Sequence, residues 1–405
     1  MKTIVQKVLE KMGKVRKLEL ASLTLLFTTI LTLCGKVKFV NLSRYSDRHE
    51  KTFRRHYAKA MNFSAFNGAF IALEIPVEHG ILGVLDASFT PKSGKKTFGL
   101  DRFYNGSHGR AERGLELSLF AIVDTETENA YAFHAQQTYE KSLYPLLSRT
   151  DYYLIHLEQN KPHWPKRLQY LAVDSAYANA PFIDGVKILG LDVISKLRQN
   201  ANLRYLFEGE QKARGARRKY DGKVDFTDFS RFTWVKSVKT GVDLYTWVVW
   251  HPTLKRRIRL AAIVNRNHDT PRYVLLFSTH VDQDAEEILQ FYQLRFQIEF
   301  IFRDAKQFTG LSDCQARNEK AIDFHFNTSL IALNLAKREA RLQHSGTKDF
   351  VFSMNNVKRR ALNDHLLGRF IAKLDLDPTL IKSHPNFQSL RDYGVMGANR
   401  LTESG

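Results

Sequence analysis

The sequence predicts an α/β fold in which a mixed sheet flanked by helices is interrupted by a β-rich insertion, with helical regions at both ends. Three observations predict it. Short apolar runs typical of buried strands alternate with helical stretches in residues 73–199. Further strand-like runs, separated by polar turns, fill residues 200–282. Helical patterns occupy the remaining segments, and a chain of 405 residues is long enough for two or three domains.

The N-terminal region, residues 1–72, is expected to be helical. Its stretch from Leu20 to Gly35 lacks charge, but it is shorter than the roughly 20 residues that a membrane-spanning helix needs. We therefore expect a buried helix and no membrane partner. Beyond it, Asp47 and Glu50 have the spacing of a capping box that opens a basic helix. That helix is either a DNA-recognition element or a solvated basic face.

The first part of the core, residues 73–199, contains two apolar runs that each end in an aspartate followed by small residues. Asp86 directly follows the run ILGVL, and Asp174 directly follows the run LQYLAV. A loop is expected over residues 92–113, two further strands over 115–124 and 130–138, and a helical stretch over 140–160. An aspartate after a strand is often only a turn or cap residue. Two of them in the same setting predict carboxylates delivered to one rim of a sheet.

The insertion, residues 200–282, is expected to carry strands at FTWVKSV, LYTWVVW, IRLAAIV and YVLLFS. Its three tryptophans could pack in the sheet or stack on a base. Basic clusters that could grip phosphates, or simply be solvated, are Lys212, Arg214, Arg217, Arg218, Lys219 and Lys223, and Lys255, Arg256, Arg257 and Arg259.

The second part of the core, residues 283–340, includes the stretch FYQLRFQIEFIFRDAKQ. On one continuous helix, Tyr292, Arg295, Glu299 and Lys306 would fall within about 60° of arc and form a polar stripe. Arginine and glutamate four residues apart can also be a simple surface ion pair. The two strand-end aspartates favour the alternative, in which Glu299 is a third carboxylate of one site. Residues 341–405 are expected to form a helical C-terminal region.

Composition favours a polyanionic partner. The chain has 61 Lys plus Arg against 42 Asp plus Glu, a net charge of +19, so DNA or RNA is the natural ligand. Its two cysteines are too few for a zinc finger or a disulfide framework and favour a reducing cytoplasm. Three carboxylates without a histidine or cysteine cluster suit Mg²⁺, with Mn²⁺ as a substitute. Two such ions about 4 Å apart would assist attack on a phosphodiester.

The order Asp86, Asp174, Glu299, with Glu299 inside Tyr-x2-Arg-x3-Glu-x6-Lys, resembles the DDE transposases of bacterial insertion sequences that carry this motif. The resemblance covers about residues 75–340. It implies an RNase H-like core, with Asp86, Asp174 and Glu299 as catalytic ligands of the metal. It also implies that Tyr292, Arg295 and Lys306 contact DNA.

The resemblance further implies a function and its partners. The protein would bind the inverted-repeat ends of its element, hydrolyse the DNA there and join the 3′-hydroxyl ends to target DNA, acting as a homodimer at the bacterial nucleoid. The run that starts at Asp174 differs from the acidic, arginine-containing run of the family, so the route of strand processing stays open. A nuclease of the same fold without strand transfer and a DNA-binding regulator derived from a transposase are the alternative functions.

Overall fold

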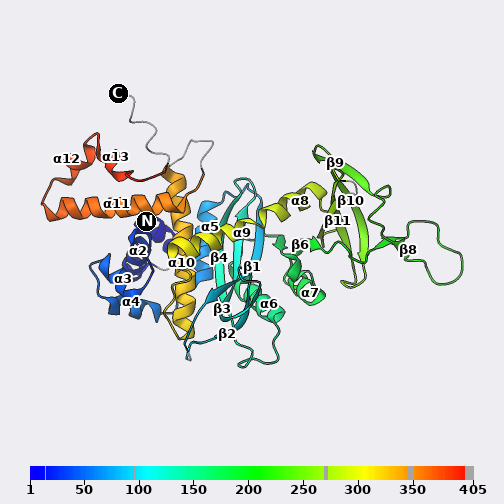
Figure 1. The fold of residues 1–405 in the computed structure, drawn as a ribbon, viewed down its shortest axis with the longest axis horizontal. Helices are drawn as coiled ribbons and strands as arrows, with labels where there is room; N and C mark the ends of the chain where they lie inside the picture. Colours follow the sequence, from blue (N-terminus) through cyan, green and yellow to red (C-terminus); the bar gives the residue numbers. More distant parts are fainter. Residues whose placement is uncertain (14, 95, 269–271, 344–350, 397–405) are drawn as a thin grey trace.

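The computed structural model describes residues 1–13, 15–94, 96–268, 272–343 and 351–396. Twelve strands form one mixed sheet with helices packed on it. Figure 1 shows the N-terminal helices and α11 on one side of the central strands and the insertion on the other. The predicted α/β class with an RNase H-like core and a β-rich insertion is thereby confirmed.

The core half of the sheet runs in the order β4-β3-β1-β5-β6. The β1–β3 and β3–β4 pairs are antiparallel, whereas β1–β5 and β5–β6 are parallel. Because parallel strands are buried on both faces, the runs that precede Asp86 and Asp174 are almost wholly apolar. The strands of this half are β1 (Ile81–Pro91), β2 (Asp101–Asn105), β3 (Arg110–Asp124), β4 (Asn129–Thr138), β5 (Tyr170–Val173) and β6 (Asp192–Leu197).

The insertion continues the same sheet, because its last strand pairs antiparallel with β6. Its strands are β7 (Arg204–Leu206), β8 (Tyr220–Lys223), β9 (Thr233–Lys239), β10 (Val242–His251), β11 (Arg256–Asn265) and β12 (Arg272–Ser278). The last four match the predicted runs, whereas β7 and β8 were not predicted. These two strands are short, and β8 has no buried residue, so they carry little apolar signal.

Five helices precede the sheet: α1 (Lys2–Lys11), α2 (Lys17–Thr32), α3 (Phe39–Arg44), α4 (Glu50–Tyr57) and α5 (Phe63–Glu74). The uncharged stretch forms most of α2, which is buried among α1, α10 and α11. Across the described residues, no helix has both the length and the apolar character needed to cross a membrane. The predicted capping box at Asp47 was wrong, because His49 is the N-cap of α4 and accepts the Lys51 N–H.

Within the first part of the core lie α6 (Arg149–Asn160), η1 (Lys161–His163), η2 (Ser175–Tyr177) and α7 (Ala180–Ile188). The loop expected over residues 92–113 was wrong in part, because it contains β2 and the start of β3. The helix expected over 140–160 begins only at Arg149, where Ser148 and Asp151 form a capping box that fixes its start.

The chain then runs through α8 (Ala285–Leu294), α9 (Gln297–Asp304), a π-helical turn η3 (Ala305–Thr309), α10 (Glu319–Gln343), α11 (Met354–Lys373), α12 (Pro378–Ser383) and α13 (Phe387–Arg391). The predicted C-terminal helices therefore exist within the described residues. Residues 344–350 and 397–405 of that region lie outside them.

The long helix α10 covers the edge strand β4 through two asparagines. The Asn327 side chain accepts the Ala135 N–H and donates to the Ala135 carbonyl, at 2.9 and 3.0 Å. Seven residues on, Asn334 makes the same pair of bonds with Ala132, at 2.9 and 2.8 Å. The two amides replace a neighbouring strand, so this edge is protected from pairing with another chain.

Candidate active site

The register of β1 and β5 places Asp86 and Asp174 at matching positions on neighbouring strands. Leu85 pairs with Val173 in the parallel ladder, and the next residue on each chain is an aspartate. The Asp86 carboxylate accepts its neighbour's N–H, from Ala87, at 2.8 Å. Asp174 ends its strand and caps η2 in the same way. The two aspartates therefore lie side by side as predicted, but the expectation that both end a strand was wrong for Asp86, because β1 continues to Pro91 whereas β5 ends at Val173.

Glu299 lies on α9, but the expected single helix over residues 291–307 was wrong. The chain instead forms α8 and α9, which meet at Arg295 and Phe296, and then enters the π-helical turn that contains Lys306. At the junction, the Ile298 and Glu299 N–H groups bond carbonyls three residues back rather than four. The break has a packing cause, because α8 lies on insertion and core strands whereas α9 lies on β1 and β4.

Three members of the predicted stripe remain together despite this break. The Arg295 guanidinium lies 3.5 Å from the Glu299 carboxylate and over the Tyr292 ring, with 5.5 Å from its carbon to the ring centroid. Only 13% of the Arg295 side chain is exposed, and its buried Nε has no hydrogen-bond partner among the described residues. The exposed part of the guanidinium, rather than its enclosed Nε, is what an acceptor such as a phosphate oxygen could reach.

Lys306, the fourth member, reaches β1, the strand that carries Asp86. Its ammonium donates to the Ser88 hydroxyl at 2.7 Å and to the Phe89 carbonyl at 3.0 Å. Burial lowers the pKa of Lys306, and the nearby Asp86 carboxylate partly opposes that shift. Lys306 therefore lies at the same site as Asp86, with one of its three N–H donors unused in these two bonds.

Electrostatics link the three carboxylates. The pKa of Asp86 is raised to about 6, first by burial and further by the negative charges of Asp174 and Glu299. The Ala87 N–H and the Arg295 guanidinium act in the opposite direction. Repulsion between carboxylates is relieved when a cation binds between them, so the local field favours a divalent ion.

The donor chemistry of the site fits a hard divalent cation. Asp86, Asp174 and Glu299 offer only carboxylate oxygens, which Mg²⁺ and Mn²⁺ prefer. Over the described ranges, no group of three His, Cys, Asp or Glu side chains is already arranged to hold an ion. Glu299 pairs with Arg295 and its side chain is 43% exposed, so among the three predicted ligands it has room to turn.

Two neighbours of the site were not identified from the sequence. Ser88 receives Lys306, and the buried Tyr177 side chain lies close enough to Asp86 to feel its charge. Burial raises the pKa of Tyr177 well above its usual value. Its ring packs 5.1 Å from that of Tyr153, whose hydroxyl donates to Glu116 at 3.1 Å. The position of Tyr177 in the sequence, three residues after Asp174, was the signal that could have identified it as a neighbour of the site.

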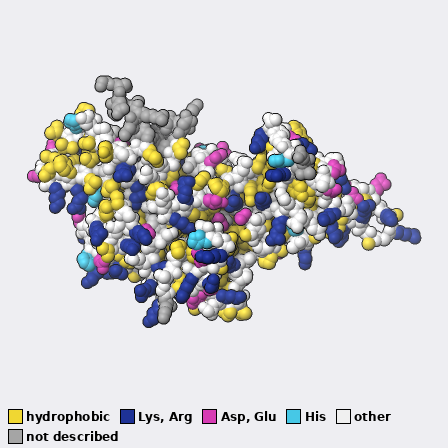
Figure 2. All heavy atoms as spheres, viewed as in Figure 1, with side chains coloured by type: hydrophobic (Ala, Val, Ile, Leu, Met, Phe, Trp, Pro, Cys, Tyr) yellow, Lys and Arg dark blue, Asp and Glu magenta, His cyan; other side chains and the backbone are white. Residues whose placement is uncertain are grey.

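Basic side chains surround these elements and extend along the insertion. Figure 2 shows many Lys and Arg side chains on the visible face, including the arm around β8 at the far right. Lys212, Arg214 and Arg217 on this arm are exposed, whereas Arg218 pairs with Asp221. Trp234 is 56% exposed, whereas Trp247 and Trp250 are half-buried.

Comparison with known proteins agrees with this geometry. A family model described as a transposase DDE domain matches residues 80–335, which is more than half of the chain and includes all six predicted site residues. The comparison with curated proteins finds no match. The resemblance inferred from the motif is confirmed, and the chain belongs to the transposase DDE domain family.

Proposed function

We propose that this protein is a transposase that binds the inverted-repeat ends of its insertion sequence, cleaves the DNA there and joins the 3′-hydroxyl ends to target DNA. One observation carries the proposal. In a chain with a transposase DDE domain, Asp86 and Asp174 occupy matching positions on parallel strands, and Glu299 is near enough to raise the pKa of Asp86.

Asp86, Asp174 and Glu299 would hold two Mg²⁺ ions, with Mn²⁺ as a substitute. Such ions neutralise charge on the attacking, leaving and phosphoryl oxygens of a phosphodiester. The two aspartates are set by strand register, and Glu299 would complete the set by turning away from Arg295.

Arg295, Tyr292 and Lys306 would position the DNA strand. The guanidinium of Arg295 would offer its exposed N–H groups to a phosphate oxygen, and the Tyr292 ring beneath it limits its rotation. Lys306 keeps two bonds to β1 and offers its third N–H to the DNA. Groups fixed in this way lower the barrier by orientation and by placing charge in advance.

Cleavage and strand transfer would use the same position for the attacking oxygen. Water attacks the phosphodiester first, breaking the P–O bond and leaving a free 3′-hydroxyl. In the second step that hydroxyl attacks a phosphate of target DNA, so one P–O bond forms as another breaks and no external energy source is required. We propose that two copies of the chain pair two element ends at the nucleoid.

The test uses a duplex that carries the short inverted repeats flanking the gene. Wild type and Glu299→Gln are incubated with it and Mg²⁺, and cut and joined products are separated on a gel. We expect wild type to cut and join, and Glu299→Gln to bind without doing either. Cutting without joining would favour a nuclease, binding without cutting by wild type would favour a regulator, and full activity of Glu299→Gln would overturn the assigned site.

A further inference from the structure

A second site lies beside Lys306. A hollow of about 460 Å³ forms where three distant stretches of chain meet: the turn after α2, the π-helical turn η3 and the first turns of α11. Four cationic side chains line this basic hollow, and they are Lys36, Lys306, Lys358 and Arg359. The sequence does not predict this grouping, because its members are separated by up to several hundred residues.

The positive charge of the basic hollow exceeds the negative charge in its lining. Asp313 is the acidic residue in its lining, and its carboxylate already accepts the Val37 N–H at 2.8 Å. Lys358 donates to two neutral carbonyls, of Ile30 and Phe308, at 3.0 and 2.9 Å. In the part of the chain that the structure describes, none of the four cations has a carboxylate within salt-bridge distance. Like charges gathered in this way favour an anion.

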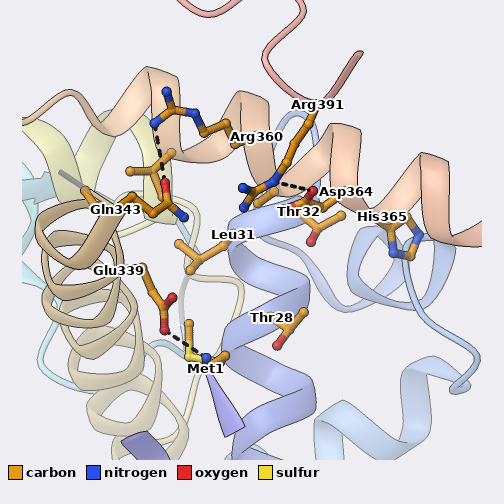
Figure 3. Close-up of a pocket in the computed structure, with 13 residues that line it drawn as sticks. Met1, Thr28, Leu31, Thr32, Glu339, Gln343, Arg360, Asp364, His365 and Arg391 are labelled. Carbon is orange, nitrogen blue, oxygen red and sulfur yellow. Dashed lines mark hydrogen bonds and ion pairs between the residues drawn. The ribbon is translucent and has the colours of Figure 1, made fainter. Parts of the chain in front are cut away.

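A neighbouring hollow provides the contrast. It measures about 360 Å³ and lies between α2, α10 and another face of α11. Figure 3 shows that its charged groups are matched: the Met1 ammonium bonds Glu339 at 2.8 Å, and Arg391 bonds Asp364 at 2.7 Å. Its charges are satisfied without a ligand, whereas those of the basic hollow are not.

We propose that the basic hollow binds a backbone phosphate of the DNA strand next to the phosphodiester that is cut. The proposal rests on the proposed function. Lys306 belongs to both sites, since it lines the hollow and bonds Ser88 on β1. Ser88 is two residues beyond Asp86, roughly 7 Å along the strand. DNA places a phosphate about every 3.4 Å of rise along each strand. A strand cut at the carboxylates therefore brings a phosphate to the hollow within a few nucleotides.

Lys36 and Arg359 are the residues that contact this phosphate, because their side chains are exposed at the mouth of the basic hollow. Lys306 and Lys358 are partly buried and stay bonded to protein oxygens, so they lie behind the phosphate. Burial lowers the pKa of Lys358 to about 8, so Lys36 and Arg359 supply most of the positive charge. The phosphate would thus bridge the N-terminal helices, the core and α11.

The test compares two double variants that each remove two positive charges. Lys36→Gln/Arg359→Gln alters the basic hollow, and Lys373→Gln/Lys382→Gln alters exposed residues on the far end of α11 and on α12. Affinity for the inverted-repeat duplex is measured by fluorescence anisotropy across a salt series without divalent metal, so the result does not depend on cleavage. Circular dichroism checks that both variants fold.

We expect the hollow variant to lose about tenfold or more in affinity at low salt and its salt slope to fall by roughly one to two, as for one or two lost phosphate contacts. The control should keep the slope of wild type. Equal slopes for the hollow variant and wild type, or equal losses in both variants, would overturn the proposal. If the hollow double variant unfolds, Lys36→Glu, on an exposed turn, makes the same comparison. Failure of the cleavage assay would count against the proposed function alone.

Discussion

The two halves of the sheet differ in what they expose. In the core half, Leu171, Ala172 and Val173 of β5 are fully buried, and the strand ends directly at Asp174. In the insertion, every residue of β9 is exposed or half-buried, and the arm around β8 presents exposed basic side chains. The difference teaches that rigid, buried strands fix the carboxylates to each other, while the rim of the insertion, at β9 and the arm around β8, offers an adaptable positive surface to a long polyanion.

The two halves communicate through the α8–α9 junction. Helix α8 packs on strands of both halves, and α9 packs on β1 and β4. Arg295 lies at that junction and contacts both Tyr292 and Glu299. Despite this link, we expect changes in the core to act on chemistry or stability and changes to exposed basic side chains of the insertion to act on DNA binding.

The largest effect is expected at the core carboxylates. Asp86→Asn and Asp174→Asn should each lower DNA cleavage by at least about 10³-fold, because each removes a ligand oxygen with its charge. The melting temperature of Asp86→Asn should not fall, since Asp86 is buried with a raised pKa. Gel-based rates and thermal melts measure both. Glu126→Gln on an exposed turn is the control, and a matching loss of cleavage there would undermine the assignment.

The second-largest effect is expected from acid, which should lower the stability of the core half. His156 is buried and His134 beside it is half-buried, and their enclosure in the protein lowers the pKa of His134 to about 4 and that of His156 well below 6.5. Both stay neutral in the folded protein while the unfolded chain takes up protons below pH 6.5. Stability is therefore unaffected above that pH and falls as pH drops from 6.5 toward 4, by roughly 1.4 kcal/mol per unit for each histidine.

Denaturant titrations at several pH values would measure this loss. Replacing His156 by Gln should reduce the slope of stability against pH, whereas His268→Gln, at an exposed position of the insertion, should leave it unchanged. A slope that is the same in both variants would show that the acid sensitivity arises elsewhere.

The protected edge of the core gives the third comparison. Asn334→Leu should lower the free energy of unfolding by about 2–3 kcal/mol, because it leaves the buried N–H and carbonyl of Ala132 without partners. Asn267→Leu in the insertion removes one exposed bond, to the Thr240 carbonyl, and should cost far less. Chemical denaturation measures both, and similar costs would refute the asymmetry between the halves.

The smallest effect is expected on the arm of the insertion. Arg214→Gln/Arg217→Gln should weaken DNA binding by about tenfold and reduce the salt slope by one to two, because exposed arginines contribute through phosphates. The cleavage rate at saturating DNA should stay at the wild-type value. Lys2→Gln/Lys7→Gln on α1 provides the charge-matched control, and a fall in the saturated rate would mean that the arm takes part in catalysis.

The sequence predicted the parts of this arrangement that carry strong local signals. Apolar runs located β1 and β5, and the aspartates at their ends lie at the matching positions that the structure shows. The roles of the six site residues came from the family motif and remain predictions. The α8–α9 break could not be predicted, because no glycine or proline marks Arg295 and Phe296 and its cause is packing on two groups of strands.

Other features escaped prediction for a similar reason. The asparagines that cover β4 look like ordinary polar residues of a helix until the strand beside them is known. The basic hollow is lined by residues from three distant stretches of the sequence, and periodicity within one stretch does not indicate that it will contact another. Local pattern predicts elements and their ends, whereas contacts between distant elements depend on the whole fold.

The central claim is that Asp86, Asp174 and Glu299 hold divalent metal together, and Fe²⁺ can test it without relying on activity. Fe²⁺ with ascorbate and peroxide generates hydroxyl radicals that cut the polypeptide beside the bound ion, and the fragments are mapped by mass spectrometry. We predict cuts near residues 86, 174 and 299 that excess Mg²⁺ suppresses and that the Asp86→Asn/Glu299→Gln variant lacks. Cuts elsewhere, or the same cuts in that variant, would contradict the account.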